Sequence, residues 1–242
     1  PQEPGLGTVD TIRAMLDGQV KVFFALGGNF AAATPDTVQT WKALRQCDLT
    51  VHVTTKLNRS HIVHGRDALI LPCLGRTEMD MQAGGLQGVT VEDSMSMVHI
   101  SMGINPPAAP DLLSEPAIVA RLAAATLGAR SQTPWLWLVE DYSRIRDKIA
   151  DVFVDFADFN TRVSVPGGFR LRNTASERVW ITGPGKAVFK THAVPVDTPL
   201  HQARQRKGDA KVFALMTTRS HDQYNTTIYG DDDRYRGVFG QR

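Results

Sequence analysis

The chain has 242 residues, 42% hydrophobic and 21% charged, which is typical of a globular protein with one large domain or two smaller ones. Its 27 basic and 25 acidic residues leave a net charge of +2, too small to attract nucleic acid or an anionic membrane surface by itself. Two distant cysteines, Cys47 and Cys73, exclude a disulfide framework and a cysteine-rich iron-sulfur or zinc cluster within this stretch. With no apolar run of membrane-spanning length and no signal-peptide pattern, we expect a cytoplasmic protein.

The first third of the chain alternates strands and helices. Apolar runs predict strands at 21–26, 48–55 and 68–72, and the last of these ends at a proline. Between the first two strands, Thr34 as cap and Pro35 at the first position predict a helix that runs to about residue 46. A helical turn is expected at 60–67. This order predicts an α/β fold in which crossover helices connect a parallel sheet.

The remainder is expected to pass from mixed structure to strands. A strand or hairpin is predicted at 86–101, a helix from the Ser114 cap to Gly128, and a further helix at 135–153. From residue 166 onward, short apolar runs indicate strands, at 169–173, 178–183, 186–194 and 211–218. We therefore predict an α/β domain at 1–165 and a truncated, β-rich domain at 166–242.

Two polar segments follow the first two predicted strands. GGN occupies 27–29, and TTKLN occupies 54–58. Ligands of open parallel sheets bind at the carboxyl ends of strands, where small residues let a phosphate or sugar approach the backbone. The alternative is that Gly27 and Gly28 are simple turn residues. The absence of a G-x-G-x-x-G sequence disfavours an ordinary nicotinamide cofactor.

Other polar groups have ordinary structural interpretations. His61 and His64 have helical i, i+3 spacing, but no third ligand is evident, so helix capping or core packing is favoured over a metal site. Glu78 and Asp80 could act in acid-base chemistry, although solvated loop carboxylates are common. We assign no catalytic residue and no metal ligand.

The segment MTTRSHDQYNTT, at 216–227, places Ser220 beside His221 and Asp222. Three consecutive residues cannot readily adopt the geometry of a hydrolase triad, so a serine hydrolase is the weakest alternative. Arg219 is suited to bidentate contact with phosphate or carboxylate. The remaining polar side chains, which include Thr217, Gln223 and Asn225, can hold a polar heterocycle or can satisfy one another in a surface loop.

The order of these segments resembles the middle-to-late part of the large subunit of molybdopterin oxidoreductases, in the formate dehydrogenase-like branch of the dimethyl sulfoxide reductase superfamily. A strand ending in Leu26-Gly27-Gly28-Asn29-Phe30 is similar to the Gly-acid-Asn/Asp-Pro turn of that family. The later motifs that carry the resemblance lie at 51–58, 67–72, 78, 88–90, 215–219 and 223–226. The similarity extends from about residue 12 to 242.

The resemblance implies a cofactor, molybdopterin guanine dinucleotide with molybdenum. The first domain would bind its guanosine end through Gly27, Asn29 and the polar segment that includes Thr54, Lys56 and Asn58. The start of a C-terminal β-barrel domain would contact the pterin dinucleotide, and the residues implied there are Thr217, Arg219, Ser220, Gln223 and Asn225.

Departures from the family pattern indicate a divergent subgroup. Phe30 stands where the family has proline, Thr54-Thr55 where it has Gln-Asp, and Glu92-Asp93-Ser94 where many members have Glu-Gly-Arg. The cysteines of the family's 4Fe-4S iron-sulfur cluster and its Cys, Sec or Ser molybdenum ligand have no counterpart. The resemblance therefore implies an internal to C-terminal fragment of a longer enzyme, itself inactive, whose parent acts on a small-molecule substrate and an electron-transfer partner. The alternative is a stand-alone nucleotide-binding regulatory module.

Overall fold

The computed structural model describes residues 4–207, 212–215, 223–224, 227–228, 230–233 and 237–240. The chain divides into two compact units, Pro1–Asn173 and Thr174–Arg242, and each is treated by itself below. The domain boundary that the sequence predicts, between residues 165 and 166, stays a prediction.

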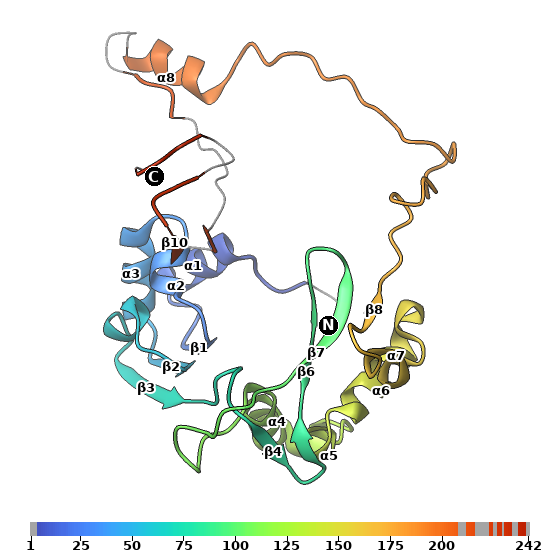
Figure 1. The fold of residues 1–242 in the computed structure, drawn as a ribbon. Coiled ribbons are helices and arrows are strands. Elements are labelled where there is room, and N and C mark those ends of the chain that lie inside the picture. Colours follow the sequence, from blue (N-terminus) through green and yellow to red (C-terminus); the bar gives the residue numbers. More distant parts are fainter. Residues whose placement is uncertain are drawn as a thin grey trace. The chain divides into compact units, whose positions relative to one another are not determined.

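A three-stranded parallel sheet lies at the start of the first unit. It consists of β1 (Val22–Leu26), β2 (Leu49–Thr54) and β3 (Asp67–Pro72), in the order β1-β2-β3. Phe24 lies beside Val51, and Val51 beside Leu69, so all three strands end at the same edge. The predicted parallel sheet is confirmed, and the chain is mixed α/β (Figure 1).

Short helices pack against one face of this sheet. They are α1 (Thr8–Leu16), α2 (Phe30–Ala33), α3 (Thr37–Arg45) and the 3-10 helix η1 (Arg59–Ile62). Met15, Ala43 and Cys47 form the buried centre of this layer, and Phe23 of β1 packs against them. The predicted helix start, with Thr34 as cap and Pro35 at the first position, is wrong. The cap is Asp36, whose carboxylate accepts the Gln39 N–H at 3.1 Å, and the helix begins at Thr37.

Antiparallel strands follow, and β7 is the centre of a second sheet. The strands are β4 (Asp80–Gln82), β5 (Gly85–Gln87), β6 (Val89–Glu92), β7 (Met97–Ser101) and β8 (Phe169–Arg170). The pair β4-β5 forms a small hairpin, and β6-β7-β8 forms the sheet. Val98 of β7 is buried against Phe159 and Val163. The hairpin expected within 86–101 is therefore confirmed.

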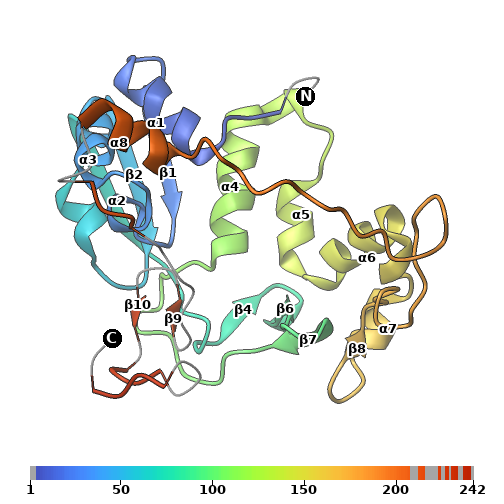
Figure 2. The same ribbon diagram turned by 90° about the horizontal axis from the view of Figure 1, so that it is seen from above.

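The helical part of the first unit contains α4 (Glu115–Leu127), η2 (Gly128–Arg130), α5 (Trp135–Glu140), α6 (Ser143–Val152), η3 (Val154–Phe156) and α7 (Phe159–Val163). Figure 2 shows α4 and α5 running beside each other, and Ala120 and Val139 pack between them. Gly128 ends α4 at a φ of 51°, as predicted. Ser114 precedes α4, but its side chain makes no cap.

The single helix predicted at 135–153 is wrong. Asp141 has extended backbone angles, φ −151° and ψ 114°, and separates α5 from α6. Its carboxylate accepts the Ser143 N–H at 2.9 Å, and the next residue, Tyr142, donates its backbone N–H to Oε1 of Gln87 at 2.7 Å. Side-chain acceptors thus replace the helical hydrogen bonds at this point.

The second unit contains α8 (Pro199–Lys207), β9 (Gln223–Tyr224) and β10 (Thr227–Ile228), of which β9 and β10 pair antiparallel. The strands predicted at 178–183, 186–194 and within the described residues 212–215 are wrong, because no regular structure forms there. Ile181 and Phe189 are 87% and 92% exposed, so these apolar runs have no layer to pack against in the described chain. The C-terminal β-barrel stays a prediction. None of the described helices has the length and apolar character needed to cross a membrane.

Candidate functional site

The carboxyl edge of the parallel sheet carries the residues predicted in the first domain. Gly27 donates its N–H to the Val53 carbonyl at 2.8 Å, which extends the β1-β2 pairing by one residue. Gly27 and Gly28 have φ values of 67° and 72°, a region that favours glycine. The chain can therefore turn sharply at this edge while leaving its backbone uncovered by a β-carbon.

Asn58 ties the two predicted segments together. Its Nδ2 donates to the Gly28 carbonyl at 2.8 Å, and its Oδ1 accepts the Ser60 N–H at 2.9 Å. The backbone N–H of Asn58 donates to Nδ1 of His61 at 2.8 Å, which completes a capping box at η1. The structure thus brings Asn58 and the glycine turn together, with the side chain of Asn58 used in internal hydrogen bonds.

Asn29 has one occupied and one open group. Its Oδ1 accepts the hydroxyl of Ser60 at 3.1 Å, and the same hydroxyl oxygen accepts the Ala31 N–H at 3.0 Å. Ser60 is buried, so this arrangement holds the amide of Asn29 in place. Within the described chain, Nδ2 of Asn29 has no hydrogen-bond acceptor. It is available to donate to a ligand.

Thr54 and Lys56 complete this edge at the end of β2. The Thr54 hydroxyl donates to the Lys56 carbonyl at 2.7 Å, which tightens the turn after the strand. Lys56 is exposed, and no carboxylate among the described residues pairs with its ammonium group. The edge therefore offers an amide donor and an exposed ammonium group, which suit a polar ring and a phosphate.

Most of the site residues predicted in the C-terminal segment fall outside the described part of the chain. Thr217, Arg219, Ser220 and Asn225 lie outside the described residues. Gln223 belongs to β9, where only the backbone is described.

Three histidines lie near this part of the sheet without forming a metal site. The buried His61 caps η1, as the structural interpretation of its spacing predicted, whereas His64 is exposed and contacts the Gly65 carbonyl at 2.7 Å. His52 lies in β2, and its ring centre is 5.1 Å from that of His61. Burial lowers the pKa of His52, and the neighbouring His61 and His64 lower it further. In the described chain, no three His, Cys, Asp or Glu side chains gather as they would around a metal ion.

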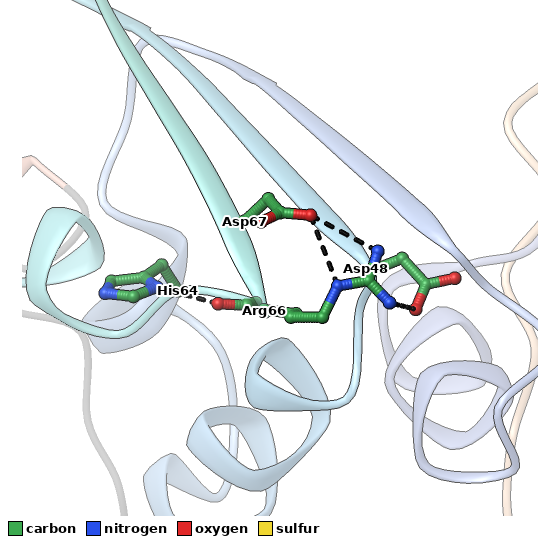
Figure 3. Close-up of polar contacts among 5 residues, drawn as sticks. Asp48, His64, Arg66 and Asp67 are labelled. Atoms are coloured by element: carbon green, nitrogen blue, oxygen red, sulfur yellow. Dashed lines mark hydrogen bonds and ion pairs between the residues drawn. The ribbon is translucent and has the colours of Figure 1, made fainter.

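The opposite, amino edge of the sheet carries two ion pairs. Arg66 contacts Asp48 and Asp67, each at 3.2 Å, at the start of β2 and β3 (Figure 3). A β-carbon on Gly65 would lie 2.4 Å from the Cys47 carbonyl oxygen, so the chain passes too closely for any other residue. The charges of Arg66, Asp48 and Asp67 at this edge are therefore paired with one another.

A cavity that sequence reasoning missed lies beside the carboxyl edge, next to Leu26. It has a volume of about 450 Å³, and its wall includes Glu78, Asp80 and Tyr142. Glu78 and Asp80 are half-buried, which corrects the expectation of solvated loop carboxylates. Burial, and then the hydrogen bond with Asp80, raise the pKa of Tyr142. A carboxylate followed two residues later by another was visible in the sequence, but Tyr142, the partner of Asp80, lies 62 residues further on.

The two cysteines are unsuited to metal binding or nucleophilic chemistry. Cys47 and Cys73 are 1% and 4% exposed. Burial raises the pKa of both thiols, and nearby carboxylates raise it further. Because the thiolate is the metal ligand and nucleophile, both residues are expected to act as small core side chains.

Comparison with known proteins relates the whole chain to longer proteins. No protein-family model matches it. The chain is 50% identical over 242 residues to the protein YdeP of Escherichia coli K12, and covers 31% of that protein. It is 51% identical over 243 residues to a protein of Mycobacterium tuberculosis H37Rv named uncharacterized oxidoreductase Rv2900c, and covers 30% of it. The chain thus spans about a third of the length of these curated relatives, and it has homologues that are named oxidoreductases.

Proposed function

We propose that this chain forms the guanosine-binding part of a molybdopterin guanine dinucleotide site in a molybdenum oxidoreductase similar to formate dehydrogenases. The observation that carries the proposal is the carboxyl edge of the sheet, where two glycines at positive φ adjoin the open donors of Asn29 and Lys56. The oxidoreductase names of the relatives support the redox class. Molybdenum and formate dehydrogenase-like activity are our proposals.

The residues of the edge fit the nucleotide end of such a cofactor. The glycine turn lets a phosphate or ribose approach the backbone, and Lys56 supplies a positive charge for the phosphates. Asn29 is held by Ser60 so that its Nδ2 can donate to a carbonyl of the base. Asn58 positions both loops without contacting the ligand through its own amide nitrogen, because that atom is bonded to Gly28.

The described residues do not fit the metal end. Both cysteines are buried with raised pKa values, and no other group in the described chain is arranged as a metal site. When bound, the cofactor's molybdenum would exchange electrons or an oxygen atom with the substrate. In our proposal this chain binds and orients the nucleotide and carries out no chemical step.

Further parts of the proposal concern the whole protein. Its iron-sulfur cluster, metal ligand, substrate site and electron-transfer partner would involve segments other than this chain. Thr217, Arg219, Ser220, Gln223 and Asn225 are proposed to contact the pterin dinucleotide, as the resemblance implies. A nucleotide-binding regulatory module would use the same edge, but the relatives' names favour the redox enzyme over it.

Calorimetric titration of the purified 242-residue chain with GMP, and with AMP for comparison, tests the nucleotide part. We expect weak binding that is selective for guanine. Lys56→Met should weaken GMP binding by about tenfold, because a charge-assisted contact to phosphate is lost. Lys21→Met is the matched control, since Lys21 is also exposed but precedes β1 at the opposite edge of the sheet.

A second variant tests the base contact. Asn29→Asp keeps the acceptor for Ser60 but replaces the free amide donor by a carboxylate oxygen, so it should reduce the preference for GMP over AMP. Equal affinity for the two nucleotides, or equal effects of Lys56→Met and Lys21→Met, would contradict the proposed guanosine site.

A further inference from the structure

The cavity beside the carboxyl edge has a buried floor and an exposed mouth. It lies within the first unit, and its wall includes residues of the strands from β4 to β7 and of the helices α4 and α5. Figure 2 shows the arrangement of these helices and strands. Its floor includes the buried residues Gln87, Ser114 and Tyr142, whereas Glu115 and Val119 are exposed at its mouth. A volume of about 450 Å³ is within the range of small-molecule sites.

A chain of hydrogen bonds fixes the polar part of the floor. The hydroxyl of Tyr142 donates to the carboxylate of Asp80 and lies 2.7 Å from the hydroxyl oxygen of Ser114. Since the proton of Tyr142 is directed to Asp80, the Ser114 hydroxyl donates to Tyr142. Ser114 therefore retains lone pairs. Asp80 also accepts the side-chain amide of Gln82 on its Oδ1 at 2.5 Å, and a carboxylate with one donor on each oxygen retains acceptor capacity.

The neighbouring polar groups of the floor also form hydrogen bonds within the protein. Gln87 donates its Nε2 to the Gly85 carbonyl at 3.0 Å, and its Oε1 accepts the Tyr142 N–H. Glu78 accepts the backbone N–H groups of Gly75 and Ala108 at 2.5 and 2.6 Å. Gln87 has both ends of its amide engaged and Glu78 has both carboxylate oxygens engaged, so the acceptors open to a ligand are mainly those of Ser114, Asp80 and Glu115. The hydroxyl of Ser101, elsewhere in the wall, can serve as donor or acceptor.

The charge of the wall has the same sign. Glu78, Asp80 and Glu115 contribute three carboxylates, against the single guanidinium of Arg76. Glu115 pairs with no cation or donor among the described residues. The same carboxylates act on the buried thiol of Cys73, whose pKa is raised by burial and then by the charges of Glu115 and Glu78.

The remaining wall is apolar. Side chains of α4, α5 and α6, including Val119, Leu138 and Ile145, face the cavity, together with Leu26 at the end of β1 and the ring of Trp135. The Trp135 indole N–H already donates to Ser131 at 3.0 Å. A ligand here would bury a hydrocarbon or aromatic body against these side chains.

We propose that this cavity binds a small organic cation, an alkylammonium or arylalkylammonium compound, with its nitrogen directed to Ser114, Asp80 and Glu115 and its apolar part against α4 and α5. An ammonium group supplies three donors and a positive charge, which matches a wall of acceptors with excess negative charge. The site adjoins the nucleotide edge, since a β-carbon on Gly27 would lie 3.7 Å from Oε1 of Glu115, but the proposal does not depend on the proposed cofactor.

Three probes of similar shape and different charge test the proposal on the purified 242-residue chain. They are 2-phenylethylammonium, the neutral 2-phenylethanol and the anionic 3-phenylpropanoate. We expect calorimetry or saturation-transfer NMR to show that the cation binds at least about tenfold more tightly than the alcohol, and that the anion binds less tightly than both. Similar affinities for cation and alcohol, or tighter binding of the anion, would overturn the proposal.

Two variants at the mouth locate the binding, and both change exposed side chains. Glu115→Gln should weaken binding of the cation by about tenfold and leave that of the alcohol nearly unchanged, because it removes only the charge. Val119→Trp should weaken both by filling the cavity. Glu92→Gln is the matched control, since Glu92 is exposed at the end of β6 and outside the cavity. Cation binding that is unaffected by Glu115→Gln and by Val119→Trp would place the compound elsewhere and overturn the proposal.

Discussion

Two neighbouring regions of the first unit, the carboxyl edge of the sheet and the cavity, meet at the end of β1. Leu26 lines the cavity, and Gly27 begins the edge. At the edge, the oxygen of Asn29 accepts a hydrogen bond from Ser60, which leaves its amide donor open. In the cavity, the hydroxyl of Tyr142 donates to Asp80, which leaves acceptors open. Each region therefore offers to a ligand the hydrogen-bond donors or acceptors that the fold does not already use.

Tyr142→Phe should have the largest effect, because it acts on the floor of the cavity. The variant keeps the aromatic ring but removes the hydroxyl that joins Ser114 to Asp80, so a half-buried carboxylate loses a donor. We expect the free energy of unfolding to fall by about 2–3 kcal/mol, measured by urea denaturation. Ser114→Ala should cost less, about 1 kcal/mol, because the Tyr142 to Asp80 bond remains.

The double variant distinguishes a network from two separate contacts. If Ser114, Tyr142 and Asp80 act together, the combined loss in Ser114→Ala/Tyr142→Phe should be smaller than the sum of the single losses. Strict additivity, or no loss in Tyr142→Phe, would contradict the description of the floor given above.

Asn58→Ala should have the next largest effect, and it acts on the edge. It removes the bond to the Gly28 carbonyl and the cap on the Ser60 N–H, so urea denaturation should show a loss of about 1–2 kcal/mol. Asn58→Asp retains the cap and loses only the donor to Gly28, so it should cost about half as much. Both variants should leave binding of 2-phenylethylammonium unchanged, and a loss of that binding would show that the two regions are not independent.

Local sequence signals were sufficient for the three strands of the parallel sheet and for the polar segments that follow the first two of them. Val22–Leu26 and Leu49–Thr54 are short apolar runs that end in polar residues, and their parallel pairing requires only a crossover connection. The capping role of His61 follows in the same way from its place three residues after Asn58. These features depend on residues that are close together in the sequence.

The sequence did not predict the cavity or the structure of the second unit, because both depend on contacts between residues that are distant in the sequence. Gln87 and Asp80 bond to Tyr142 across 55 and 62 residues, and no periodicity connects them. The break at Asp141, which separates α5 from α6, follows from the same contacts. The apolar runs around Ile181 and Phe189 have the pattern of strands, but a strand also needs a paired neighbour, which the local pattern does not supply.

The smallest expected effect is a pH dependence of the free energy of unfolding that arises from His52 in the parallel sheet. His52 is 3% exposed, and its Nε2 has no hydrogen-bond partner in the described chain. Its pKa is lowered by burial and then by His61 and His64, so the folded protein favours the neutral ring while the unfolded chain takes up a proton near the ordinary value of 6.5. The stability contributed by the neutral ring is therefore complete above that value and is lost as the pH falls below it.

His52→Phe isolates this contribution, because it retains an aromatic ring beside Phe23 and His61 but cannot be protonated. Urea denaturation at about pH 7.5 and about pH 5.5 should show a smaller acid-induced loss of stability in the variant than in the wild-type chain. The cost of Tyr142→Phe should be the same in both backgrounds, since the cavity floor and His52 share no hydrogen-bond partner among the described residues. If the acid-induced loss of stability is equal in the wild-type and His52→Phe chains, other titratable groups cause it and the His52 ring does not contribute.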